Sequence, residues 1–79
     1  MKLRVKERKL GKEKAYGQYW NGEGLIEIDP RLKAKKFLTI ACHELLHAVA
    51  PRLSESHVDR ASKIMARELW KLRYRRVEK

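Results

Sequence analysis

The sequence predicts a small α+β domain in which three short strands precede two helices. Apolar residues alternate with charged ones near the start of the chain, and from Arg31 onward they recur at helical spacing. Between these parts, residues 21–24 read Asn-Gly-Glu-Gly, a composition that favours a tight hairpin turn. The 79 residues are enough for one hydrophobic core, so we expect a single domain over residues 1–79.

The three strands are predicted at residues 3–10, 16–20 and 25–28. The first alternates apolar and charged side chains, which is typical of a half-exposed strand, and a turn is expected at residues 11–12. The second is aromatic, and the third ends before Pro30, because proline is poorly tolerated inside a strand. Short turns between such strands favour an antiparallel meander.

Two helices are predicted after the strands. Apolar residues recur every three or four positions over residues 31–50, and Pro51 disfavours helical backbone at the residue before it, so the first helix should end there. Ser54 is a good N-cap, because its hydroxyl can accept a hydrogen bond from a main-chain N–H of the first turn. A second amphipathic helix is therefore expected from Glu55 to about Arg75.

Composition restricts the classes of protein to consider. Cys42 is the only cysteine, which excludes an internal disulfide, and the sequence contains no continuous apolar run typical of a signal peptide or membrane span. These features favour a cytoplasmic protein without a membrane partner. Cys42 lies about 100° around the helix from His43, so it is expected to be a small packing residue and not a ligand.

Positive charge is concentrated at both ends of the chain, within a net charge of +10. Residues 1–14 hold seven Lys or Arg against two Glu, and residues 71–79 hold five against one. Such termini can bind nucleic acid or another polyanion weakly. No nucleic-acid-binding motif accompanies them, so this expectation rests on charge alone.

The most informative motif is His43-Glu44-Leu-Leu-His47 in the first predicted helix. Positions i and i+4 lie on one face of a helix, so both imidazoles can bind one metal ion. Zn²⁺ in catalytic sites usually has three protein ligands and one open position. Glu44, beside the ligands, is the expected general base for a zinc-activated water.

A third ligand is expected after Pro51, where three residues compete for this role: Glu55, His57 and Asp59. Glu55 is favoured because Asp59 lies one helical turn further on, where it can orient a ligand histidine by accepting its N–H. His57 is the alternative, since on a helical wheel it lies as close to the apolar stripe as Glu55 does. The spacing alone does not decide between them.

With Glu55 and Asp59 on the next helix, the motif resembles the gluzincin arrangement of zinc metallopeptidases. The chain is similar to a very small, phage-type zincin, distantly like SprT-like and ImmA/IrrE-like domains. The resemblance implies Zn²⁺ held by His43, His47 and Glu55, with Glu44 as general base. It also implies an edge strand that holds an extended peptide substrate, here Gly24, Leu25, Ile26, Glu27 and Ile28.

The function expected from this resemblance is zinc-dependent hydrolysis of peptide bonds. No residue matches the oxyanion-stabilising motif of large gluzincins, and Tyr16, Tyr19 and Tyr74 are candidates by their chemistry. Two alternatives remain open: a non-catalytic structural zinc domain, and a basic nucleic-acid-binding protein in which the histidine motif is incidental.

Overall fold

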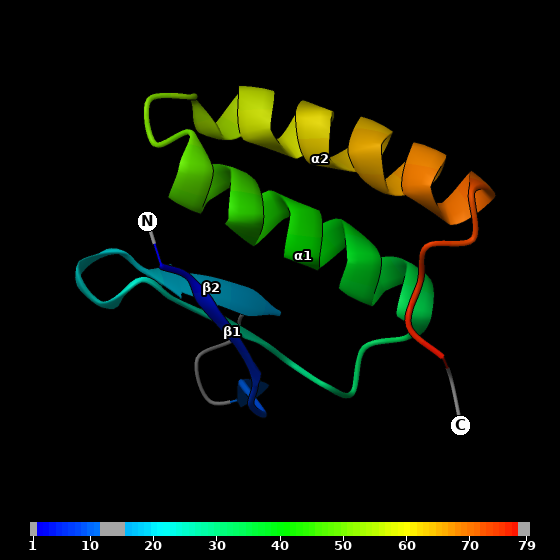
Figure 1. The fold of residues 1–79 in the computed structure, drawn as a ribbon, viewed down its shortest axis with the longest axis horizontal. Helices are drawn as coiled ribbons and strands as arrows, with labels where there is room; N and C mark the ends of the chain where they lie inside the picture. Colours follow the sequence, from blue (N-terminus) through cyan, green and yellow to red (C-terminus); the bar gives the residue numbers. More distant parts are fainter. Residues whose placement is uncertain (1, 12–15, 78–79) are drawn as a thin grey trace.

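In the computed structural model, which describes residues 2–11 and 16–77, a three-stranded sheet packs against one helix and a second helix lies along the first (Figure 1). The predicted α+β class, with three strands before two helices, is confirmed. Within the described residues, no helix is long and apolar enough to cross a membrane. The elements are β1 (Arg4–Glu7), β2 (Gly17–Trp20), β3 (Leu25–Ile28), α1 (Ala34–Val49) and α2 (Glu55–Lys71).

The sheet is mixed, so the predicted antiparallel meander is wrong in one pairing. Strands β2 and β3 are antiparallel as predicted, whereas β1 pairs with β3 in parallel, in the order β1-β3-β2. The reason lies after β1, where the buried Leu10 donates its main-chain N–H to the carboxylate of Asp29 at 3.1 Å, just beyond the end of β3. This contact holds the chain after β1 at the end of β3, and β2 pairs with the other edge of β3. The turn predicted at residues 11–12 lies partly outside the described residues, since residue 12 is not described.

The hairpin between β2 and β3 forms where the sequence predicts it. Gly24 closes the turn with a φ of 60°, in the left-handed region that favours glycine. A Cβ atom at this position would lie 2.7 Å from the carbonyl oxygen of Lys2, so space is limiting as well. Ile26 and Ile28 of the following strand are fully buried and pack with Ala48 of α1 as the centre of the core.

The face of the sheet that bears Glu27 carries a polar network. Glu27 is only 8% exposed, and its carboxylate accepts hydrogen bonds from the side chains of Arg8 (2.7 and 3.1 Å), Trp20 (2.7 Å) and Gln18 (3.2 Å). The bonds from Arg8 and then Trp20 lower the pKa of Glu27 to about 2, against the opposing effect of burial. The network joins residues from both sides of β3, so it holds the sheet together on this face.

Helix α1 ends as predicted, and α2 begins as predicted. Ala50 leaves the helical conformation directly before Pro51, and the hydroxyl of Ser54 accepts the N–H of His57 at 3.2 Å. The far end of α2 differs, because the helix stops at Lys71 and not near Arg75. Arg73 takes a left-handed φ of 68°, and the N–H of Tyr74 donates to the carbonyl of Leu69, a C-terminal cap that stops the helix.

The chain after α2 returns to the start of the domain. The guanidinium of Arg75 lies 3.6 Å from the ring centre of Trp70, and that of Arg76 lies 4.3 Å from the ring centre of Phe37 on α1. Arg76 also donates to the carboxylate of Glu7 on β1 at 2.9 Å. Part of the basic C-terminus therefore contacts aromatic rings and a carboxylate of the domain itself.

We expect Glu27→Gln to lower the free energy of unfolding at pH 7 by about 2 kcal/mol, since hydrogen bonds to a charged group contribute about 1.5–3 kcal/mol. The pKa of Glu27 is near 4.5 in the unfolded chain and about 2 in the folded one. This contribution is therefore complete above pH 4.5 and is lost as the pH falls toward 2. Urea denaturation across this range should show the two proteins converging in stability, and a constant difference would contradict the assignment.

Candidate metal centre

Two histidines lie one turn apart on α1, near its C-terminal end. His43 and His47 both come from the region of the helix that faces the start of α2, and their ring centroids are 4.8 Å apart. Their Nε2 atoms are separated by 3.2 Å. The side chains are 17% and 27% exposed, so each ring is mostly enclosed.

Glu55 completes a group of three potential ligands. It is the first residue of α2, and its carboxylate oxygens lie 2.9 Å from the Nε2 atom of His43 and 2.9 Å from that of His47. The turn between the helices places it there, because Pro51 ends α1 and Ser54 starts α2 three residues later. These three residues, called the metal group below, can hold a metal ion.

The spacing within the metal group fits a tetrahedral ion. Zinc–nitrogen and zinc–oxygen bonds of about 2.0–2.1 Å place the ligand atoms of a tetrahedron about 3.3 Å apart. The two histidine nitrogens are 3.2 Å apart, each is 2.9 Å from a different carboxylate oxygen of Glu55, and one ligand atom from each residue lies within 4.8 Å of the others, so each pair is spaced near the edge of such a tetrahedron. The Glu55 side chain is 70% exposed, so the metal group is accessible to solvent on this side. The chemistry of the donors, two imidazoles and a carboxylate, suits Zn²⁺ among other divalent metals.

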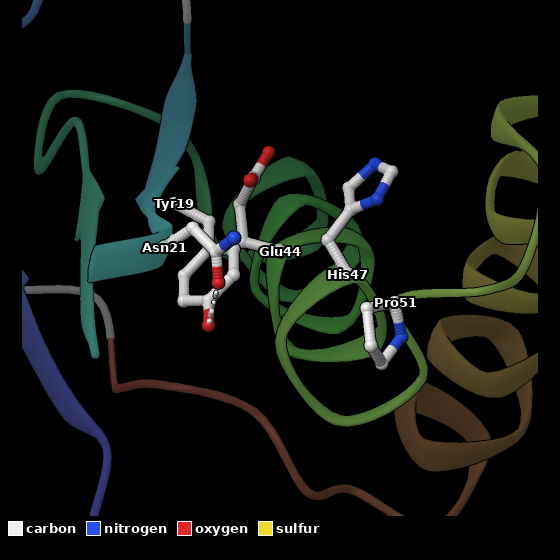
Figure 2. A pocket seen from close by; sticks show the side chains of 5 residues that line it. All are labelled: Tyr19, Asn21, Glu44, His47 and Pro51. Carbon is white, nitrogen blue, oxygen red and sulfur yellow. Dashed lines mark hydrogen bonds between the residues drawn. The ribbon is translucent and has the colours of Figure 1, made fainter. Parts of the chain in front are cut away.

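Glu44 lies beside the metal group and is not part of it. Its side chain and that of His47 rise from the same side of α1, with Tyr19 and Asn21 of the hairpin across from them (Figure 2). Together with Pro51 these residues line an open hollow of about 340 Å³. Burial raises the pKa of Glu44, while the neighbouring histidines oppose this effect. A carboxylate of raised pKa is a better proton acceptor, as a general base requires.

The other two residues predicted near the metal have different surroundings. His57, the alternative third ligand, lies outside the metal group, and its Nδ1 atom is 2.9 Å from the hydroxyl of Ser54. Asp59 forms an ion pair with Lys63 at 3.0 Å and lines a hollow that it shares with His43. Its predicted role as acceptor for a ligand histidine stays a prediction. Cys42 is a buried packing residue, as expected.

The predicted substrate strand has the wrong position for its role. Residues 24–28 were expected at the edge of the sheet, but β3 is its central strand, flanked by β1 and β2, so it has no free edge. The free edge near the metal group belongs to β2. The N–H of Asp29 donates to the carbonyl of Tyr16, so by alternation the main-chain groups of Gly17 and Tyr19 point away from β3.

Gly17 is a site residue that the sequence reasoning missed. A Cβ atom there would lie 2.6 Å from the Cγ2 atom of Ile40 and 3.2 Å from the Cγ atom of Glu44. Strand β2 can therefore approach α1 this closely only at a glycine. A glycine inside a short aromatic strand was the available signal, because such glycines often mark a close approach of backbone to another element.

Among the three tyrosines considered for oxyanion stabilisation, Tyr19 is the one that shares a hollow with Glu44 and His47. Its hydroxyl is 3.3 Å from the side-chain oxygen of Asn21. The ammonium of Lys36 lies 3.9 Å from the ring centre of Tyr16, and Tyr74 is exposed beyond α2.

Comparison of the chain with protein-family models, curated proteins and solved structures finds no match.

We expect Gly17→Ala to lower the free energy of unfolding by about 1–3 kcal/mol, because overpacking forces neighbouring side chains or backbone to shift. Gly22→Ala is the matched control, since a Cβ atom at Gly22 would meet nothing within 4 Å. Thermal unfolding of both variants distinguishes the two sites. Equal melting temperatures for the two variants would show that β2 does not depend on this close approach.

Metal stoichiometry measured by mass spectrometry on untagged protein tests the ligand set. With zinc supplied, we expect about one ion per chain in the wild type and in His57→Gln, and a loss of affinity of at least about tenfold in Glu55→Gln. The opposite pattern would assign the third ligand to His57.

Proposed function

We propose that this protein is a small zinc-dependent peptide hydrolase of the gluzincin kind. The observation that carries the proposal is the convergence of His43, His47 and Glu55 on one point, with the carboxylate of Glu44 one residue along α1. Three protein ligands with an open outer side are typical of catalytic zinc sites, whereas structural sites have four protein ligands. Zinc held by this group would supply a Lewis acid that can polarise a carbonyl and acidify a water molecule.

In this proposal Glu44 carries the proton transfers. Its carboxylate accepts a proton from the attacking water and later gives it to the amine that leaves. Its position supports this role, because it faces the hollow between β2 and the end of α1, where the scissile peptide would lie. The raised pKa of Glu44 supports it too. Tyr19, on the opposite wall, is the candidate donor to the developing oxyanion.

An extended peptide is the substrate shape that we propose. The main-chain groups of Gly17 and Tyr19 form a short free strand edge among the described residues, and their strand packs directly on α1 beside Glu44. A peptide that adds to this edge by main-chain hydrogen bonds would run over the metal group. This role replaces the one first expected for residues 24–28.

The single-residue test of the mechanism is Glu44→Gln. We expect this variant to bind one zinc per chain as the wild type does, since residue 44 is outside the metal group, and to lose at least about a hundredfold in turnover. Cleavage of a mixed peptide library, followed by mass spectrometry, is the measurement. Turnover at the wild-type rate in the zinc-loaded variant would exclude Glu44 as the base.

A further inference from the structure

The metal group lies between two hollows that differ in the residues that line them. One is the hollow lined by Tyr19, Asn21 and Glu44, described above. The other, of about 550 Å³, begins at His43 and extends toward the N-terminal end of α1. The two histidines connect these hollows, because His47 lines the first hollow, His43 lines the second, and their rings are adjacent. A peptide that crosses the metal group along α1 would therefore occupy both.

The second hollow, which we call the lysine groove, has a mostly apolar surface but is lined by several lysines, whose alkyl chains can cover apolar surface while their ammonium groups stay charged. Four lysines and one aspartate line it, and Asp59 is already paired with Lys63 at 3.0 Å. Its floor includes Ile40, one turn before Glu44 on α1. The lysines that line the groove are Lys33, Lys35, Lys36 and Lys63.

The lysines lie on more than one wall of the groove. Lys36 belongs to α1 and its ammonium stacks over the ring of Tyr16, directly before β2, at 3.9 Å. Lys63 belongs to α2, on the opposite wall. An adjoining hollow of about 250 Å³ shares Lys35 and Lys63 with the groove and adds Arg67, so the basic lining continues away from the metal group. Both helices thus bring lysines to the groove, where the ammonium group of Lys36 contacts Tyr16 and that of Lys63 contacts Asp59.

We propose that the lysine groove selects peptide substrates that carry an acidic segment on one side of the scissile bond. This proposal rests on the proposed function for the position of the bond and on the groove itself for the preference. Several lysines along one open hollow attract carboxylates and repel basic segments, so charge complementarity supplies discrimination between substrates. An extended acidic peptide also fits the free edge of β2, since strand addition leaves its side chains free to reach the lysines.

The test uses full-length Glu44→Gln protein loaded with zinc, so that binding is measured without turnover. The probes are fluorescein-labelled twelve-residue peptides with one common apolar centre, flanked on one side or the other by four acidic, four neutral or four basic residues. Anisotropy at fixed low salt gives the dissociation constants. We expect at least one acidic peptide to bind about tenfold or more tightly than its neutral partner, and the basic peptides to bind weakest.

Charge-reversal variants identify the lysines on which the preference for acidic peptides depends. Lys36→Glu and Lys63→Glu should each reduce the affinity for the acidic peptide by at least about threefold, with little effect on the neutral one. Lys6→Glu is the matched control, because Lys6 lies on β1, at the edge of the sheet opposite β2, and should change both affinities equally. Circular dichroism and zinc content confirm that each variant is folded and loaded.

The outcomes separate this proposal from the proposed function. Equal affinity for acidic and neutral peptides would overturn the lysine groove, even if the wild type cleaves both. Acidic preference that depends on Lys36 and Lys63, in a wild type that cleaves no peptide, would support the groove and overturn the hydrolase. A single-stranded oligonucleotide of equal charge that binds more tightly than the acidic peptide, through the same lysines, would overturn the proposal in favour of nucleic-acid binding.

Discussion

Close packing of α1 on α2 is the constraint on which the candidate site depends. The two helices have small or compact buried residues where they meet, among them Cys42, Val58, Ser62 and Ala66. This packing, together with a turn fixed by a proline and an N-cap serine, brings a carboxylate of one helix within 2.9 Å of both imidazoles of the other. A bulkier side chain at Ala66 or Ser62 would separate the helices and with them the ligands. The site is thus a property of the helix pair, and the sheet supplies the wall opposite it.

Local signals made much of this structure predictable from the sequence. The boundary at Pro51, the cap at Ser54 and the hairpin ending at Gly24 each follow from the conformational preferences of one or two residues. The grouping of His43 with His47 follows from helical periodicity in the same way. What the sequence did not reveal depends on contacts between distant residues. The parallel pairing of β1 depends on Leu10 reaching Asp29, and the close approach at Gly17 depends on a helix more than twenty positions away.

Basic residues gather at one end of the helix pair, and the metal group lies at the other. The metal group and Glu44 lie toward the turn between the helices, whereas lysines and arginines gather at the start of α1 and the end of α2. The first turn of α1 contains no acidic residue, although the helix dipole favours negative charge there. Positive charge at this position costs some helix stability, so a reason outside the helix itself is expected. The proposed role of the lysine groove would provide one, because it needs cations on the path that leads to the metal group.

The parallel pairing of β1 with β3 has a consequence for how the chain folds. The hairpin of β2 and β3 and the antiparallel pair of α1 and α2 join neighbouring segments, so both can form early with little loss of chain entropy. Strand β1 pairs with residues about twenty positions away, and Arg76 contacts Glu7 across 69 positions. If the hairpin and the helix pair form first, these non-local contacts form last. Because the metal group spans only residues 43–55, a metal ion that binds there could be captured by the helix pair before the two termini have reached their places.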